Sequence, residues 1–426
     1  MNGEETAEPR SNEAPDPNPQ ARIVVRDDLR RSRLTVFFRF FLALPHLIVL
    51  GVWSLIALLM AIINWFAILF SGRTVGGDLQ VRYLRYFTQV DAYLNLAANP
   101  FPGFGGEADS YPIEVEVSEA RRQNRWKTAF RFVLALPAVL LASTFGAAGA
   151  QVGGDNFRAS FGIIAAAAFL GWFASLVRAR MPQGLRDLIV YGLGYSVQVA
   201  AYVLLVTDRY PDSDPLAPRY GPPPPDHPIR ISTDDDLRRS RLTVFFRLLL
   251  WLPHLVWLIL WGVATAFAIL ANWFVTLFAG RPAGALHGFI AGYLRYWTHT
   301  TAFLYLVANP FPGFTGRAGS YPVDLHIAPP ARQNRWKTGF RLILAIPGLI
   351  VVGALGNAFA LVALFGWFVG LMLGRMPRGL RNLGVFALRY HAQVAAYVWI
   401  LTDRYPYAGP SLELPRPEAV PVPQSG

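Results

Sequence analysis

The tract from Arg341 to Arg375 has no formally charged residue between its two ends, and most of its residues are apolar. Its roughly 33 uncharged positions exceed the roughly 20 that one straight transmembrane helix needs. Gly353, Gly356 and Asn357 lie near the midpoint, where a hairpin would need residues that tolerate a turn. Both ends are basic, which favours the cytoplasmic side for each of them. The tract therefore predicts two short helices that fold back on each other across the membrane.

The composition supports a chain embedded in a bilayer. Hydrophobic residues make up 53% of the 426 residues and charged residues only 15%. The net charge of +12 comes from arginines at the ends of apolar tracts rather than in one basic segment. We therefore expect anionic lipid headgroups as the partner, and no nucleic acid. The absence of cysteine excludes disulfides and thiolate metal sites.

The chain contains four altered copies of one unit. Arg33 to Phe104 recurs at Arg241 to Phe314, and Ala120 to Pro211 recurs at Ala331 to Pro406. All four copies share two arginines separated by five residues, a proline six residues after the second arginine, and a Trp-Phe pair before a closing basic residue. The plan is a tandem duplication of a two-unit module, A-B followed by A′-B′.

Composition sets the expected domain boundaries. Pro-rich and polar stretches at both ends and in the middle indicate solvated tails and a spacer. We expect a disordered tail at 1–21, a first membrane module at 22–210 with units 22–104 and 111–210, a Pro-rich linker at 211–228, a second module at 229–406 with units 229–314 and 321–406, and a Pro-rich tail at 407–426.

Unit B differs from the others near its midpoint, where about 15 extra, partly polar residues lie within 143–160. This insertion predicts an exposed turn in the middle of the tract. Each tract is followed by a third helix-length segment. In unit A, Arg82, Arg85 and Gln89 fall on one side of that segment, which favours a helix lying in the membrane interface. The uncharged segment at 188–207 could instead span, so the placement of the third helices stays open.

A short run with alternating apolar residues precedes each unit. Period-two alternation of β-branched residues predicts half-buried strands. The runs before the A-type units carry arginine, and those before the B-type units carry carboxylates, so we expect A to pair with B and A′ with B′ in a small cytoplasmic sheet. The four runs are Ile23 to Arg26, Ile113 to Val117, Ile229 to Ile231 and Val323 to Ile327.

Arginine recurs at two places in every unit. We call Arg39, Arg131, Arg247 and Arg341 the inner arginines, and Arg73, Arg180, Arg281 and Arg375 the closing arginines. A long side chain near a helix end can keep its guanidinium among lipid phosphates while its stem packs in lipid. A specific phospholipid-headgroup or anion site would use the same side chains. The sequence leaves both interpretations open, and all eight are candidate headgroup residues.

Tryptophan, proline and histidine also recur at fixed places. The tryptophans near the closing arginines predict an aromatic belt, and the prolines predict helix kinks. The belt residues are Trp65, Trp172, Trp273 and Trp367, and the kink residues are Pro45, Pro137, Pro253 and Pro347. His46 and His254 follow two of these prolines without carboxylate or cysteine neighbours, which is a weak metal signal. We predict no metal site.

Few residues indicate catalysis. The B-type units end in Thr-Asp-Arg-Tyr-Pro, which contains Asp208 in one copy and Asp403 in the other. The A-type units have Asn-Pro-Phe-Pro at this place, so we predict a helix stop with a local ion pair rather than an acid–base group. The sequence has no nucleophile elbow, zinc-protease motif or nucleotide-phosphate loop. We predict no catalytic residue, no cofactor and no enzymatic activity.

Several of these motifs together resemble a known family. They are Tyr-Pro before an alternating strand, Arg-x5-Arg, L-A-[LI]-P, W-F-x-x-L-[FM]-x-G-R and T-D-R-Y-P. The set resembles a bacterial membrane protein family, common in actinobacteria and catalogued as domain of unknown function 4389. The resemblance covers nearly all of 23–406 as two tandem modules. It implies a polytopic inner-membrane protein and lends no substrate, cofactor or catalytic residue.

The sequence therefore predicts an all-α integral membrane protein of the bacterial plasma membrane. Four repeated units would each contain a transmembrane helical hairpin, an amphipathic interfacial helix and a preceding strand, with about eight short spans and both termini cytoplasmic. We expect it to bind or organise anionic lipid, or to scaffold a membrane complex with a protein partner or a second copy, and shaping of the bilayer is an extension. The alternative is a transporter or channel built from duplicated repeats.

Overall fold

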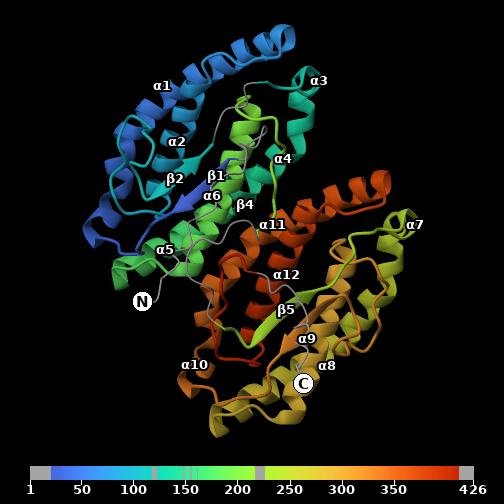
Figure 1. Ribbon diagram of the computed structural model, residues 1–426. Coiled ribbons are helices and arrows are strands. Elements are labelled where there is room, and N and C mark those ends of the chain that lie inside the picture. Colours follow the sequence, from blue (N-terminus) through green and yellow to red (C-terminus); the bar gives the residue numbers. More distant parts are fainter. Residues whose placement is uncertain are drawn as a thin grey trace, which may run out of the picture.

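The computed structural model describes residues 21–117, 122–146, 149–153, 156–160, 162–215 and 226–411, and the chain is mainly helical (Figure 1). The expected disordered tail lies outside these ranges except for Ala21. The middle of the Pro-rich linker, 216–225, and most of the C-terminal tail, 412–426, also lie outside them.

Three of the four apolar tracts form single continuous helices. These are α1 (Arg33–Ser71), α8 (Arg247–Ala279) and α11 (Arg341–Leu373). The predicted hairpins are therefore wrong for units A, A′ and B′, and with them the expectation of about eight short spans. Gly356 lies inside α11, where a glycine costs about 1 kcal/mol relative to alanine without ending a helix. One stripe of mostly small and apolar residues is buried along the length of α11, and this packing keeps the helix continuous through its midpoint.

The tract of unit B is divided, but it does not fold back either. It contains α4 (Arg131–Phe145) and α5 (Ile163–Arg178), and the insertion between them forms the antiparallel strands β3 (Gly149–Gly153) and β4 (Asn156–Ser160). Both helices pack against α6 (Gln183–Val203), and Figure 1 shows them toward opposite ends of it. The insertion therefore divides what is one long helix in the other units into two consecutive helices. We refer to α1, α8, α11 and the α4–α5 pair as the long helices.

Each long helix is followed by a shorter partner helix packed against it. The partner helices are α2 (Gly77–Leu94), α6, α9 (Gly284–Leu304) and α12 (Arg378–Val398). The third segments were predicted as helices, and this is confirmed. Two polar residues of the stripe predicted in unit A contact the protein: Arg85 lies 3.3 Å from Glu114, and the Gln89 amide donates to the Ser110 hydroxyl at 3.2 Å. Polar side chains of α12 also bond within the protein. Arg389 donates to the carbonyls of Tyr407 and Gly409, and the Gln393 amide donates to the carbonyl of Ile229.

The predicted strand pairing is confirmed. β1 (Arg22–Val25) pairs antiparallel with β2 (Ile113–Glu116), and β5 (Ile229–Thr233) pairs antiparallel with β6 (Val323–Ile327). The register sets Arg22 opposite Glu116, as the alternation of charge requires. β1 packs on α6, β2 on α2, β5 on α12 and β6 on α9. We call the β1–β2 pair the first sheet and the β5–β6 pair the second sheet. Figure 1 shows both of these sheets in front of the partner helices.

Short helices lead into three of the long ones. They are α3 (Arg125–Ala129), α7 (Arg241–Phe245) and α10 (Arg335–Gly339), and each is separated from its long helix by one phenylalanine. The two halves of the chain meet where α11 packs against α4 and α5. Residues that follow the last partner helix also cross between halves, since the Tyr407 hydroxyl donates to the Asp187 carboxylate at 2.9 Å.

Glycine-to-alanine substitutions test the continuity of α11. Gly356 has no atom within 4 Å of an added Cβ, so Gly356→Ala should raise the free energy of unfolding by up to about 1 kcal/mol. Gly374 follows the helix at φ +67°, so Gly374→Ala should lower it by about 1 kcal/mol. Thermal unfolding in detergent, followed by tryptophan fluorescence, measures both. A destabilised Gly356→Ala would mean that the midpoint turns.

Acid should loosen the second sheet from α9. Burial alone would raise the pKa of Asp324, but hydrogen bonds from His299 Nε2 (2.7 Å) and the Gly319 N–H (2.6 Å) outweigh it and lower that pKa. A carboxylate with a lowered folded pKa stabilises the fold above its unfolded pKa of about 4, and this contribution is lost as pH falls through the folded pKa. The stability difference between wild type and Asp324→Asn should therefore be constant above about pH 5 and shrink as the pH falls below about 4, as measured by thermal unfolding.

Candidate lipid-headgroup site

The inner arginines are buried inside the protein. Each has 2–3% of its surface exposed, and its guanidinium donates to two backbone carbonyls just at or beyond the end of a partner helix. The acceptors are Tyr93 and Ala98 for Arg39, Tyr202 and Thr207 for Arg131, Phe303 and Ala308 for Arg247, and Tyr397 and Thr402 for Arg341. The structure therefore does not place these four guanidinium groups at a surface where a headgroup could reach them.

The physical role of the inner arginines follows from how helices end. The last carbonyls of a helix have no partner within the helix and carry the negative end of its dipole. A guanidinium supplies several N–H donors together with positive charge. It also lies over the aromatic ring of the residue it contacts, 4.3–4.7 Å from the ring centroid, in all four places. Each inner arginine is thus a C-terminal cap for a partner helix.

The capped segment is itself strained, which explains why it needs a cap. The second residue after each partner helix is a leucine or isoleucine in the left-handed region, at φ between 61° and 64°: Leu96, Leu205, Leu306 and Ile400. A branched residue pays about 1 kcal/mol or more to adopt this conformation. The arginine contacts on either side of that residue hold the turn in place.

A second set of capping residues was not predicted from the sequence. A long polar side chain lies eight residues before each inner arginine and donates to the carbonyl of the left-handed residue. These side chains are Arg31, Gln123, Arg239 and Gln333. Arg31 is also paired with Asp27 at 2.8 Å, with both side chains almost fully buried. The recurrence of a long polar side chain at this fixed spacing could have indicated these capping residues in the sequence.

Asp208 belongs to the same arrangement. It was predicted to form a local ion pair in Thr-Asp-Arg-Tyr-Pro, but its carboxylate lies 2.7 Å from the guanidinium of Arg131. Asn99 takes this place in unit A, where its side-chain oxygen accepts from Arg39 at 3.3 Å. The predicted helix stop is confirmed, since α6 ends before this segment. The predicted local ion pair is wrong in its partner, because Asp208 pairs with Arg131 of α4.

The closing arginines, in contrast, lie on the surface at the ends of the long helices. Three of them form a backbone bridge with a second exposed arginine that precedes a neighbouring long helix: Arg180 with Arg30, Arg73 with Arg122, and Arg375 with Arg238. The Arg281 guanidinium donates to the Pro330 carbonyl at 3.3 Å. Exposed arginines are therefore gathered in pairs where long helices meet.

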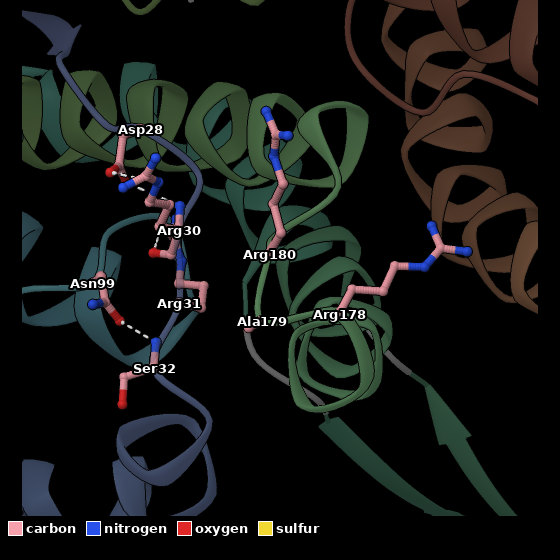
Figure 2. Close-up of a pocket in the computed structure, with 8 residues that line it drawn as sticks. All are labelled: Asp28, Arg30, Arg31, Ser32, Asn99, Arg178, Ala179 and Arg180. Carbon is pink, nitrogen blue, oxygen red and sulfur yellow. Dashed lines mark hydrogen bonds and ion pairs between the residues drawn. The ribbon is translucent and has the colours of Figure 1, made fainter.

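One junction forms a hollow of about 730 Å³, which we call the arginine hollow. Figure 2 shows Arg178 and Arg180 leaving the end of α5 in different directions, opposite the loop that carries Arg30. Among the described residues, neither Arg178 nor Arg180 has an ion-pair partner, so their charge is not neutralised internally. The lining residues are Asp28, Arg30, Arg31, Ser32, Asn99, Arg178, Ala179 and Arg180.

Apolar side chains surround this positive charge. Leu34 and Val177, on α1 and α5, are 70% and 73% exposed, and Phe37 is 58% exposed. A surface that sets unpaired guanidinium groups beside open apolar side chains suits an anionic amphiphile. In the second half, Leu373 stands in the place of Arg178, so the equivalent junction has one guanidinium less.

Three of the predicted belt tryptophans join a long helix to a neighbouring helix. Their indole N–H groups donate to backbone carbonyls: Trp65 to Thr128 of α3 (3.0 Å), Trp172 to Val36 of α1 (3.1 Å) and Trp273 to Thr338 of α10 (2.9 Å). Trp367 is also half-buried. The phenylalanine after each tryptophan is the exposed ring. A role for the tryptophans in a lipid belt remains a prediction.

The recurring prolines and histidines lie within the protein framework. Pro45, Pro137, Pro253 and Pro347 are inside α1, α4, α8 and α11. The ring of His46 hydrogen-bonds the Tyr86 hydroxyl at 2.8 Å, and His254 bonds Tyr296 at 2.7 Å. In the described ranges, no group of three or more metal-ligating side chains comes together.

The fold defines a helical membrane protein, because α1, α8 and α11 are long and apolar enough to cross a membrane. The model of the family described as Domain of unknown function (DUF4389) matches residues 33–104, 241–315 and 335–408, just over half of the chain. The chain therefore belongs to this family. The matched segments leave out unit B, whose tract is divided into α4 and α5. Comparisons with curated proteins and with solved structures find no match.

Substitution of one inner and one closing arginine tests the cap. Arg341→Ala leaves two buried carbonyls without donors and should lower the free energy of unfolding by about 2–5 kcal/mol. Arg375→Ala removes the same side chain from the surface, so its effect should stay within about 0.5 kcal/mol. Thermal unfolding of both purified variants in detergent is the measurement. Equal effects of the two substitutions would show that burial of Arg341 contributes nothing.

Proposed function

We propose that this protein is a non-enzymatic integral membrane protein of the bacterial plasma membrane that binds and organises anionic lipid. The observation that carries the proposal is the gathering of exposed arginines at the ends of the long helices, beside exposed apolar residues. Two of them, Arg178 and Arg180, have no ion-pair partner among the described residues. An arginine near an anionic membrane surface contributes about 1 kcal/mol of attraction. The same surface offers the lipid tail an apolar environment. One anionic lipid can therefore contact the arginines with its headgroup and the apolar side chains with its tail.

The recurrence of this arrangement supports an organising role. The same arginine cap occurs after each tract, in the order A-B-A′-B′, and three of the four closing arginines form a bridge with a second exposed arginine. Several similar sites on one protein would hold several lipids near one another. Membrane proteins or a second copy of this chain are further partners in such an assembly, and the termini are proposed to be cytoplasmic.

Stabilisation by added lipid tests the proposal. A ligand that binds only the folded state stabilises it in proportion to its occupancy. Phosphatidylglycerol added to the purified full-length protein in neutral detergent should raise the thermal unfolding midpoint more than phosphatidylcholine does. The variant R30Q/R178Q/R180Q should lose most of this difference, because it removes three positively charged side chains that line the arginine hollow.

A matched control removes the same charge elsewhere. R22Q/R26Q/R230Q changes three arginines on and beside the sheets, where all three are exposed, and it should keep the response to phosphatidylglycerol. Equal stabilisation by both lipids, or equal loss in both triple variants, would contradict a site at the arginine hollow. Movement of an ion or solute into liposomes under a gradient would favour the alternative, a transporter or channel.

A further inference from the structure

The position of the sheets relative to the long helices bears on how the protein sits in its membrane. We propose that the long helices lie along the membrane plane, embedded in one leaflet, with both sheets in water on the same side. The partner of this surface is therefore a single leaflet of the bilayer. The inference rests on the proposed membrane association but not on a preference for anionic lipid.

The long helices exceed the thickness of the bilayer. α1 has 39 residues and α8 and α11 have 33 each, which at 1.5 Å per residue gives about 50–58 Å. The hydrocarbon core is about 30 Å thick. A straight helix of this length that spanned it would tilt by more than about 50°, outside the usual range of up to about 40°. A helix lying in the plane meets no such mismatch.

The sheets are packed behind the middle of the long helices. α1 covers α2 along its length, since Arg39 bonds the end of α2 and Asn64 bonds Gln80 near its start at 3.0 Å. On the other side of α2, Arg85 near its centre contacts Glu114 of β2 at 3.3 Å. A crossing orientation would therefore bring this sheet to mid-membrane depth.

The sheets cannot be placed at that depth without a large penalty. Each contains two strands, so each leaves backbone edges unpaired among the described residues, and open sheet edges are not tolerated in lipid. Arg26 and Asp109 beside the first sheet form an ion pair with both side chains more than half exposed. Arg230 on the second sheet is also exposed. These groups require water.

The apolar surface lies away from the sheets. The residues that α1 buries form one narrow stripe against its neighbours, and most of its remaining surface consists of exposed apolar side chains. α8 shows the same pattern. The strands β1, β2, β5 and β6 pack against partner helices, and both sheets are drawn on the same face of the molecule in Figure 1. One face thus suits lipid tails and the opposite face suits water.

The charge at the helix ends agrees with this placement. Within each half the long helices are joined end to end: Arg33 at the start of α1 donates to the Val177 carbonyl of α5, and Arg241 donates to the Met372 carbonyl of α11. Exposed arginines lie at both ends of α1, Arg30 at one and Arg73 at the other. If the helix lies in the plane, both ends reach the headgroups of the same leaflet.

Single-cysteine labelling tests the inference in the full-length protein, which contains no native cysteine. Ser32→Cys and Ser71→Cys place thiols at the two ends of α1, and Ser240→Cys and Ala279→Cys do so for α8; all four positions are exposed. A membrane-impermeant maleimide is applied to intact spheroplasts and to inside-out vesicles. We expect both members of each pair to label in the same preparation and to lose labelling in the other.

A thiol on the sheet completes the test. Ser232→Cys lies on β5 and is exposed, and it should label in the same preparation as the helix-end thiols. Labelling of the two ends of α1 or α8 in opposite preparations would overturn the inference, as would protection of Ser232→Cys in both. The lipid experiment above gives an independent result, so loss of lipid preference would leave this topology standing.

Discussion

The guanidinium group that closes each partner helix is the contact on which the rest of the structure depends. It joins a long apolar helix to the end of the helix that follows, and it neutralises carbonyls that would otherwise be buried without donors. The surrounding elements are set by it: the left-handed residue between the bonded carbonyls, the second cap eight residues earlier, and the carboxylate or amide that balances the charge. Because the same set recurs in four places, the long helices and partner helices keep a constant relation along the chain.

Much of the architecture could be predicted from patterns of neighbouring residues. Alternation and opposite charge gave the pairing of β1 with β2 and of β5 with β6, because both signals act across one strand pair. The helical third segments followed from their periodicity. The hairpins failed for a non-local reason: Gly353 and Gly356 are compatible with a turn or with a helix, and only the continuous stripe that α11 buries on its neighbours decides between them.

In the candidate site, too, features set by local sequence were predictable and features set by distant contacts were not. The closing arginines are exposed, since a charged residue after an apolar tract has little alternative, and their contact with lipid headgroups stays a prediction. The inner arginines have the same local sequence context as a side chain that snorkels to the interface. The backbone carbonyls that they cap lie more than 50 residues away in the sequence, so the tract itself does not distinguish a buried cap from a lipid contact.

The bond between Tyr407 and Asp187 has a consequence for how the protein is made. Asp187 is in the first half, yet its hydroxyl donor is supplied by a residue near the last described position of the chain. The first half therefore cannot reach its final set of contacts while it emerges from the ribosome. Asp187 gains this partner only after Tyr407 has been synthesised, so the two halves complete this contact together.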